Sequence, residues 1–190
     1  MQDKKSELSF KQEEKDAFEL IFYKHHDELY RYGLKLCKNE ELVKDSIQDL
    51  FLRLWKVRDN LNKIEILRPY LFRSFRNQIL DNIKIQTKNL TINEELADII
   101  DLKYSEVDFL KNEKITDEDK ARVISALNQL KPKQKEIVYL RYFEELSFES
   151  IAIIMEMNVQ SVRNTMHKAI QSLRELMLFI QFLILVPKCI

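Results

Sequence analysis

Polar and basic side chains that can read nucleic acid lie on one face of a helix predicted to begin at Val159. With Val162 turned toward the core, three- and four-residue steps place Met166, Ala169 and Leu173 on the same inner face. Amides and arginine can donate hydrogen bonds in pairs to base edges, whereas lysine suits phosphates. The outer face carries Gln160, Arg163, Asn164, His167, Lys168 and Gln171. This pattern favours DNA reading over an ordinary solvated helix.

The elements around this helix fit a helix-turn-helix. Ser147 is expected to cap a short helix over residues 148–155, and Asn158 to cap the next one. Only three residues separate the two helices, so the first would brace the second across the DNA backbone. Upstream, Thr116 begins a capping box, and Pro132 can open a helix over residues 133–143.

A second basic face is predicted on a helix over residues 69–86, opened by Pro69. Its inner positions are Leu71, Phe75, Ile79 and Asn82, and its outer strip carries Tyr70, Arg73, Asn77, Lys84 and Lys88, with Arg76 at the edge. Counted with Arg68 and Asp81, the cations leave a net charge of +4. Such a surface suits backbone tracking and base stacking, although a solvated face explains the pattern equally well.

A helix predicted over residues 40–56 presents leucines on an acidic outer face. Its inner positions are Val43, Ile47, Leu50, Phe51 and Leu54, and Leu42, Asp45, Asp49, Leu52 and Lys56 project together on the far side. Exposed leucines among acids indicate a docking site for another protein, but scattered exposed leucines are common on protein surfaces.

The composition argues against an enzyme and predicts no cofactor and no metal. Gly33 is the only glycine in 190 residues, where about 13 are usual, and this excludes glycine-rich phosphate-binding loops. The three histidines have no HExxH spacing, and Cys37 and Cys189 lie far apart outside any CxxC. Asp45 and Asp49 are one helical turn apart, but a solvated acidic face explains them better than a magnesium site.

The expected fold is all-α, with two small helical domains joined by an acidic linker. Scarcity of glycine argues against sheets, whose hairpins and bulges use it. The linker has a net charge of −7, and the chain has neither a signal peptide nor an apolar run that could span a membrane, so we expect a cytoplasmic protein. The expected segments are a tail at residues 1–14, domains at 15–88 and 120–177, the linker at 89–119, and an apolar tail at 178–190. For this last tail, packing within the protein is favoured over covering a binding face or docking on another protein or a membrane surface.

Three consecutive segments resemble the sigma-70 family of bacterial transcription initiation factors. Residues 45–55 (DSIQDLFLRLW) resemble its core-binding helix, and residues 68–81 (RPYLFRSFRNQILD) look like its promoter-melting segment. Residues 130–142, 146–152 and 159–164 are similar to its C-terminal helix-turn-helix domain. Two domains with a short linker match the extracytoplasmic-function (ECF) group. The chain departs from the family pattern at Glu156, where the turn usually has glycine, and at Lys84, where arginine is frequent.

The resemblance implies a role for each face. The core RNA polymerase, through the clamp coiled coil of its largest subunit, would bind Leu42, Asp45, Gln48, Asp49 and Leu52. The minus-10 element would contact Asn60, Asn62, Lys63, Tyr70, Arg73, Asn77 and Lys84, with a flipped base held by the loop over residues 58–67. The minus-35 element would contact Gln160, Ser161, Arg163, Asn164, His167 and Lys168. The acidic linker would thread the positively charged channel of the polymerase, and an anti-sigma factor is a further candidate partner.

Two other classes remain open at this point. A free-standing helix-turn-helix regulator would bind DNA without polymerase, but it leaves the outer leucines and the second basic face unexplained. For the third class, a structural helical adaptor, an affinity for DNA that falls as the salt concentration is raised would count against the assignment.

Overall fold

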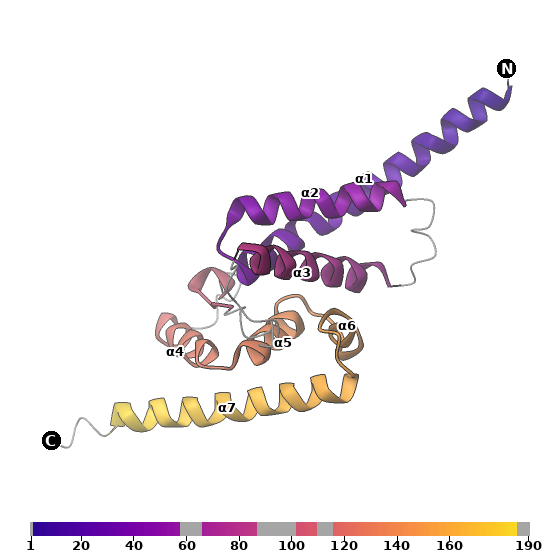
Figure 1. The fold of residues 1–190 in the computed structure, drawn as a ribbon. Helices are drawn as coiled ribbons and strands as arrows, with labels where there is room; N and C mark the ends of the chain where they lie inside the picture. Colours follow the sequence, from indigo (N-terminus) through magenta and orange to yellow (C-terminus); the bar gives the residue numbers. More distant parts are fainter. Residues whose placement is uncertain (1, 58–65, 87–101, 110–115, 186–190) are drawn as a thin grey trace. The chain divides into compact units, whose positions relative to one another are not determined.

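The computed structural model describes residues 2–57, 66–86, 102–109 and 116–185, and every regular element in these ranges is a helix (Figure 1). In residues 2–14 and 177–185 the description covers the helical backbone alone. The chain divides into an N-terminal unit, Met1–Asn89, and a C-terminal unit, Leu90–Ile190. The all-α prediction is therefore confirmed across the described ranges.

The N-terminal unit consists of α1 (Gln2–Leu36), α2 (Glu40–Lys56) and α3 (Leu67–Gln86), and each of these helices contacts the other two. The side chains of Leu29, Tyr32, Leu71, Phe72 and Phe75 are completely buried and form the core. The inner positions predicted for residues 40–56 are all buried as well. The first helix extends into the segment expected to be a tail, residues 1–14, since the backbone is helical from Gln2.

Gly33 marks the closest approach of these three helices. A Cβ at this position would lie 2.7 Å from Val43 Cγ1 and 2.8 Å from Phe75 Cζ, and both partners are fully buried. Contacts this short force neighbouring atoms to move. The single glycine of the chain therefore lets α1 pack against α2 and α3.

The helix α3 begins two residues before its predicted start. We expected Pro69 at the first helical position, but the helix starts at Leu67, and Tyr70 N–H donates to Ile66 O (3.2 Å). Proline is tolerated there because the first N–H groups of a helix have no partner within it. The start of α2 agrees with the prediction, with the Asn39 side chain accepting from Leu42 N–H.

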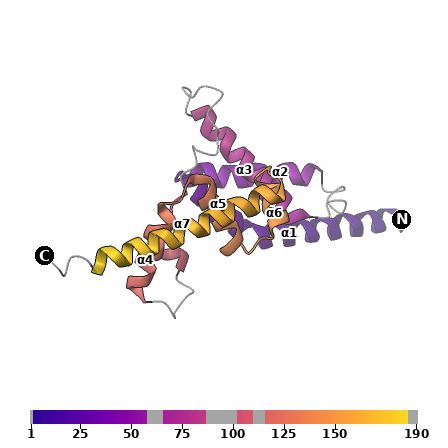
Figure 2. The same ribbon diagram turned by 90° about the horizontal axis from the view of Figure 1, so that it is seen from below.

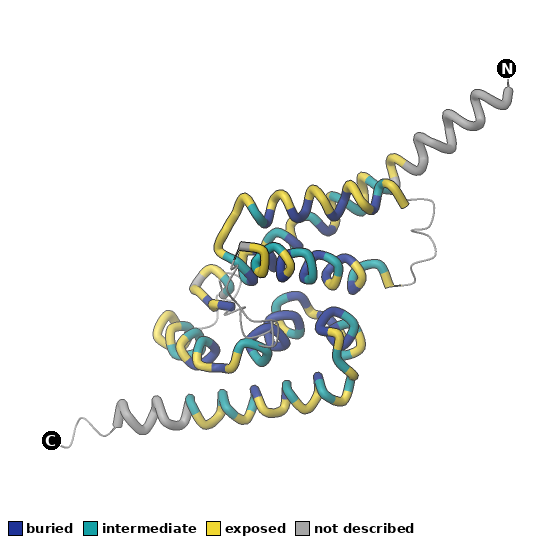
Figure 3. The backbone as a smooth tube through the Cα atoms, in the orientation of Figure 1, coloured by how far each residue is buried: buried dark blue, intermediate teal, exposed yellow. Residues whose placement is uncertain are grey.

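The C-terminal unit is arranged along its last helix, α7 (Val159–Leu185). From the first residues of α7 toward its end lie α6 (Phe148–Ile154), α5 (Pro132–Tyr142) and α4 (Asp117–Asn128), each in contact with α7 (Figures 1 and 2). Exposed stretches recur along α7, whereas α5 and α6 are largely buried (Figure 3). The unit therefore presents one side of α7 to solvent.

Side-chain caps mark the starts of α4, α6 and α7, as the sequence predicted. Thr116 Oγ1 accepts from Asp119 N–H (3.2 Å), Ser147 Oγ from Ser150 N–H (3.1 Å), and Asn158 Oδ1 from Ser161 N–H (2.7 Å). Each cap satisfies one N–H that has no partner within its helix.

The turn between α6 and α7 is strained at the position where glycine was expected. Glu156 has φ of 54°, in the left-handed region that glycine adopts without penalty. Met157 N–H donates to Ala152 O (2.9 Å) and Glu156 N–H to Ile153 O (3.4 Å), the two bonds of a Schellman motif. The turn thus keeps the Schellman geometry, although Glu156 is strained in the left-handed backbone conformation.

Part of the predicted linker is packed against the C-terminal unit. Within residues 89–119, Leu102 and Tyr104 are buried, and η3 (Glu106–Phe109) contacts α4. Tyr104 O–H donates to Lys135 O (2.8 Å), and its backbone exchanges hydrogen bonds with the Asn128 side chain (2.8 and 3.0 Å). The linker prediction is wrong for residues 102–109, because two apolar side chains among acids suffice to anchor a segment whose periodicity is weak.

The last helix continues beyond the predicted end of its domain. Residues 178–185 of the expected apolar tail are helical, whereas the expectation that this tail packs within the protein concerns side chains outside the described residues. Within the described ranges, no helix combines the length and the apolar character needed to cross a membrane.

Candidate functional site

The outer face of α2 has the exposure that its predicted docking role requires. Asp45, Gln48 and Asp49 are exposed, Leu42 is half-buried, and the Leu52 side chain remains 53% exposed. Asp49 Oδ2 accepts from Gln78 Nε2 on α3 (3.3 Å). An exposed leucine therefore lies among acids and an amide on one helix, and one of these acids, Asp49, is oriented by a residue of α3.

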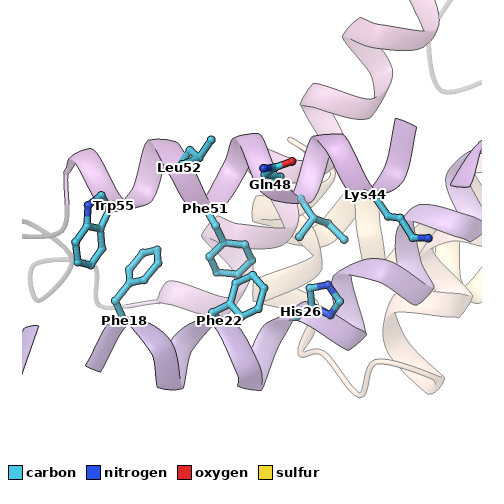
Figure 4. Close-up of a pocket in the computed structure, with 9 residues that line it drawn as sticks. Phe18, Phe22, His26, Lys44, Gln48, Phe51, Leu52 and Trp55 are labelled. Atoms are coloured by element: carbon cyan, nitrogen blue, oxygen red, sulfur yellow. The ribbon is translucent and has the colours of Figure 1, made fainter. Parts of the chain in front are cut away.

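A groove of about 330 Å³ adjoins this face, between α1 and α2. In Figure 4, Phe18, Phe22 and His26 point from α1 toward α2, and Phe51 and Trp55 point back. The ring centroids lie 5.0 Å apart for Phe18–Trp55 and 4.8 Å apart for Phe22–Phe51, in edge-on contacts that aromatic rings favour. Gln48 and Leu52 line the same groove, which joins it to the predicted docking face.

The outer strip of α3 is less basic than the sequence indicated. Tyr70, Arg73 and Lys84 are exposed and Asn77 is half-buried, but Lys84 Nζ lies 3.0 Å from Asp81 Oδ1. Arg76, predicted at the edge of the strip, is buried at 6% exposure. Lys88 and the predicted loop residues Asn60, Asn62 and Lys63 lie outside the described residues. The net charge of +4 therefore overstates the positive charge that this face offers.

Arg68 is occupied by a bond within the N-terminal unit. Its Nε and Nη2 lie 2.8 and 2.7 Å from Glu28 Oε2, and Glu28 also pairs with His25. Burial raises the pKa of the Glu28 carboxyl, but the hydrogen bonds from His25 and Arg68 outweigh it, so that this pKa lies below its usual value. The pair ties α1 to the first turn of α3.

The face of α7 predicted to read DNA is assembled as expected. Gln160, Arg163, Asn164, His167 and Lys168 are exposed, Ser161 is half-buried, and Val162, Met166 and Ala169 are buried on the opposite side. Gln160 Nε2 donates to Asn164 Oδ1 (3.0 Å), which aligns two amides along the helix. The first three turns of α7 thus present a row of hydrogen-bonding groups to solvent.

Arg163 is held by residues of α6 that the sequence analysis did not identify. Its Nη2 donates to Glu149 Oε1 (3.0 Å), and its Cζ lies 5.7 Å from the centre of the Phe148 ring. The pKa of the Glu149 carboxyl lies below its usual value. The main cause is the hydrogen bond from its own backbone N–H, and Ser147 and Arg163 contribute to the same lowering. Glu149 is thus an anion beside the central arginine of the face.

Other residues were missed because their neighbours depend on tertiary packing. Phe18 and Phe22 fit the core stripe of α1, and Trp55 follows the core positions of α2, so periodicity alone assigns them to the interior. Only the pairing of α1 with α2 opens the groove between them. Among the described side chains, no group of three His, Cys, Asp or Glu residues could hold a metal ion.

Two protein-family models match the chain in this order. The family described as "Sigma-70 region 2" matches residues 21–89, and "Sigma-70, region 4" matches residues 120–173. The first match covers α2, α3 and all residues that line the groove except Phe18, and the second covers α5, α6, most of α4 and α7 as far as residue 173.

Curated relatives match over most of their length. The chain is 24% identical over 156 residues to "ECF RNA polymerase sigma factor SigM" of Bacillus subtilis, covering 82% of this chain and 92% of that protein. It is 26% identical over 158 residues to "RNA polymerase sigma-E factor" of Streptomyces avermitilis, covering 83% of each.

Solved structures share the fold. The sigma factor RpoE of Bartonella quintana, solved with the anti-sigma factor NepR, gives a TM-score of 0.57 at 18% identity, covering 84% of this chain and 96% of that one. CnrH, solved with the cytosolic domain of CnrY, gives 0.54 at 21% identity, covering 85% and 88%.

Proposed function

The chain belongs to the sigma-70 family, in its ECF group, and from this premise we propose how its surfaces divide the work of initiation. The protein binds core RNA polymerase and directs it to promoters through their minus-10 and minus-35 elements. The polymerase provides the catalytic centre, and this chain provides sequence specificity without an enzymatic role of its own.

Core polymerase docks on the α2 face, Leu42, Asp45, Gln48, Asp49 and Leu52. The observation that carries this assignment is Leu52, half-exposed among acids and beside an aromatic groove. A partner helix that covers Leu52 and enters the groove gains the burial of several apolar side chains, about 1.5–3 kcal/mol for each one fully buried. The resemblance to the family implies that this helical partner is the clamp coiled coil of the largest polymerase subunit.

The minus-10 element contacts the outer strip of α3 and the loop that precedes it. The residues of the strip are Tyr70, Arg73, Asn77 and Lys84, and those of the loop are Asn60, Asn62 and Lys63. Tyr70 and Arg73 support this role best, since an exposed ring can stack on a base and a guanidinium can contact phosphate. Extruding a base costs a few kcal/mol, so a pocket that captures it makes promoter opening depend on sequence.

The minus-35 element contacts Gln160, Ser161, Arg163, Asn164, His167 and Lys168 on α7. The exposed amides and Arg163 are the groups able to pair with base edges, and Lys168 suits a phosphate. Because residues 102–109 are anchored to the C-terminal unit, the acidic linker is reduced to residues 90–101. This shorter linker enters the positively charged polymerase channel. By likeness to the RpoE–NepR complex, an anti-sigma factor is a further partner.

The docking assignment is tested by binding of core polymerase to three versions of the full chain. Leu52→Arg places a charge where the partner helix would pack, and we expect binding to weaken at least tenfold, as for a central interface residue. Leu20→Arg is the matched control, because Leu20 is 70% exposed on α1 and is not among the residues that line the groove between α1 and α2.

Circular dichroism checks that both variants keep their helices. Core binding by Leu52→Arg equal to that of the wild type contradicts the docking assignment. Specific promoter binding by the wild type without core polymerase favours the free-standing regulator instead.

A further inference from the structure

Beyond the row of side chains that faces DNA, α6 contributes one acid at the same surface. Glu149 is exposed at the second position of α6, and its Oε1 accepts from Arg163 Nη2 at 3.0 Å. The side chains are 61% and 51% exposed, so the pair is open to solvent and to DNA alike. An acid at a DNA-facing surface repels phosphates and therefore needs an explanation.

The position of Arg163 is fixed from two directions. The Phe148 ring lies beneath its guanidinium, with Cζ 5.7 Å from the ring centre. The same ring carries Arg141 at 5.3 Å, and Arg141 Nη1 is bonded to Leu146 O (3.0 Å). The ring is thus held by one anchored arginine and supports the other. With Glu149 at its edge, the Arg163 fork has a defined plane before DNA arrives.

The pair leaves most donors of Arg163 available. A guanidinium has five N–H donors, and Glu149 takes one of them through Nη2. The rest can still address the two acceptors that a guanine presents in the major groove. What Glu149 removes is the net charge, because Arg163 beside a carboxylate attracts a phosphate less than a lone arginine does.

We propose that Glu149 is a specificity-determining residue of the minus-35 surface, which orients Arg163 and neutralises its charge. This rests on the proposed reading of the minus-35 element by Arg163. A neutralised, oriented arginine gains little from phosphates on non-matching DNA but keeps its directed hydrogen bonds to a base. Glu149 thereby weakens binding to non-matching DNA more than binding to the matching sequence, and this widens the difference between the two.

The test compares wild type and Glu149→Gln, each as full chain assembled with core polymerase. The probes are a promoter duplex selected from a random library by the wild-type holoenzyme, and the same duplex with its minus-35 bases replaced. Glutamine keeps an oxygen that can accept from Arg163, so this variant changes mainly the charge. The matched control is Glu118→Gln, which removes the same charge from another exposed pair of the same unit, Arg122–Glu118 (2.6 Å).

For Glu149→Gln we expect affinity for the replaced duplex to rise by about 1.5-fold to 5-fold, the range that exposed ion pairs give. The slope of log K against log salt should steepen by about 0.9, the value for one added phosphate contact. Discrimination between the two duplexes should fall by a similar factor. Glu118→Gln should change neither the slope nor the discrimination.

A double-mutant cycle with Arg163→Ala separates this inference from the proposed function. If Arg163→Ala leaves discrimination unchanged, the proposed reading by Arg163 is wrong. If Arg163→Ala reduces discrimination and Glu149→Gln then adds nothing to it, the two residues act as one unit, as inferred. The inference is overturned if Glu149→Gln has its full effect without Arg163, changes nothing in the wild-type background, or lowers affinity for the selected duplex alone.

Discussion

The N-terminal unit is built from helices of 35, 17 and 20 residues, whereas α4, α5 and α6 of the C-terminal unit have 12, 11 and 7. Long helices each carry a continuous apolar stripe, and three stripes close a core of leucine and aromatic side chains. Helices of two or three turns are marginal by themselves and depend on caps and tertiary packing.

Buried polar and charged side chains occur in both units, with His25, Ser46 and Arg76 in the N-terminal unit and Lys135, Glu136 and Glu144 in the C-terminal unit. In α5 the side chains of Lys135 and Glu136 are buried, and Glu144 just beyond it accepts from Tyr139 O–H (3.1 Å). The turns around α6 hold two glutamates, Glu145 and Glu156, at φ of 54°. The comparison shows that the N-terminal unit consists of three long helices packed against one another, whereas the C-terminal unit joins short helices to α7 through left-handed turns and an anchored segment at residues 102–109.

The largest expected effect tests the anchored linker. Tyr104 packs against Phe143 and Tyr139, with ring centroids 5.4 and 6.5 Å away, and burial raises the pKa of its phenol, which stays a donor to Lys135 O. We expect Tyr104→Ala to lower the unfolding free energy of the C-terminal unit by about 3–5 kcal/mol, as for other buried aromatic residues.

Hydrogen exchange of peptides from α4 and α5 measures this change. Fluorescence of Trp55, the only tryptophan, serves as the control because it reports on the N-terminal unit. Unchanged protection of α4 and α5 in the variant would mean that residues 102–109 contribute nothing to this unit.

The ion pair between α1 and α3 in the N-terminal unit should give the next effect. We expect Glu28→Gln to lower stability by about 1.5–3 kcal/mol at pH 7, since it weakens charged hydrogen bonds to Arg68 and His25. The folded-state pKa of Glu28 lies below 4.5, so its contribution is present above pH 4.5 and is lost as pH falls through the lower value.

Urea titrations from pH 3 to pH 8, followed by Trp55 fluorescence, should show the gap between wild type and variant closing below pH 4.5. Glu19→Gln is the control, because Glu19 lies in an exposed pair with Lys15 (3.8 Å). A gap for Glu28→Gln that is constant with pH would assign its effect to packing alone.

A smaller effect tests the packing of the three long helices. Gly33→Ala gains up to about 1 kcal/mol of helix propensity, but its Cβ meets Val43 and Phe75 at under 3 Å, an overpacking penalty of about 1–3 kcal/mol. We expect a net loss of about 1 kcal/mol in the same urea titration. A net gain in stability would show that the helices can move apart without penalty.

The smallest effect concerns the strained turn before α7. Glu156→Gly should raise stability by about 0.5 kcal/mol, because relief of the left-handed strain exceeds the entropy that glycine adds to the unfolded chain. Glu156→Ala removes the side chain but keeps Cβ, so it should give no gain. Thermal unfolding of the three proteins by circular dichroism makes the comparison, and equal behaviour of Gly and Ala would exclude backbone strain.

The difference between the units also decides what could be predicted from the sequence. Caps are local, so Thr116, Ser147 and Asn158 located the starts of α4, α6 and α7 to the residue. Stripes tell which face is buried but not where a helix begins: α1 extends into the expected tail, and α3 begins earlier than predicted.

The remaining differences depend on contacts between segments distant in sequence. Arg76 on the edge of a stripe reads as a surface cation, and only the packing around α3 buries it. Tyr104 among acids reads as linker until Asn128 and Lys135 are placed beside it. The role inferred for Glu149 depends on its hydrogen bond with Arg163, fourteen residues away in the neighbouring helix.

The division of labour between the two units is tested most directly by transcription in vitro. Core polymerase is supplied with wild type or Arg163→Ala, on a selected promoter and on the same promoter with its minus-35 bases replaced. We predict that Arg163→Ala binds core polymerase as well as wild type but loses discrimination between the templates by about 1–3 kcal/mol, the worth of one bidentate base contact. Two results would contradict the assignment of promoter reading to α7 and docking to α2. One is discrimination by Arg163→Ala equal to that of the wild type, and the other is a loss of core binding that accompanies the loss of discrimination.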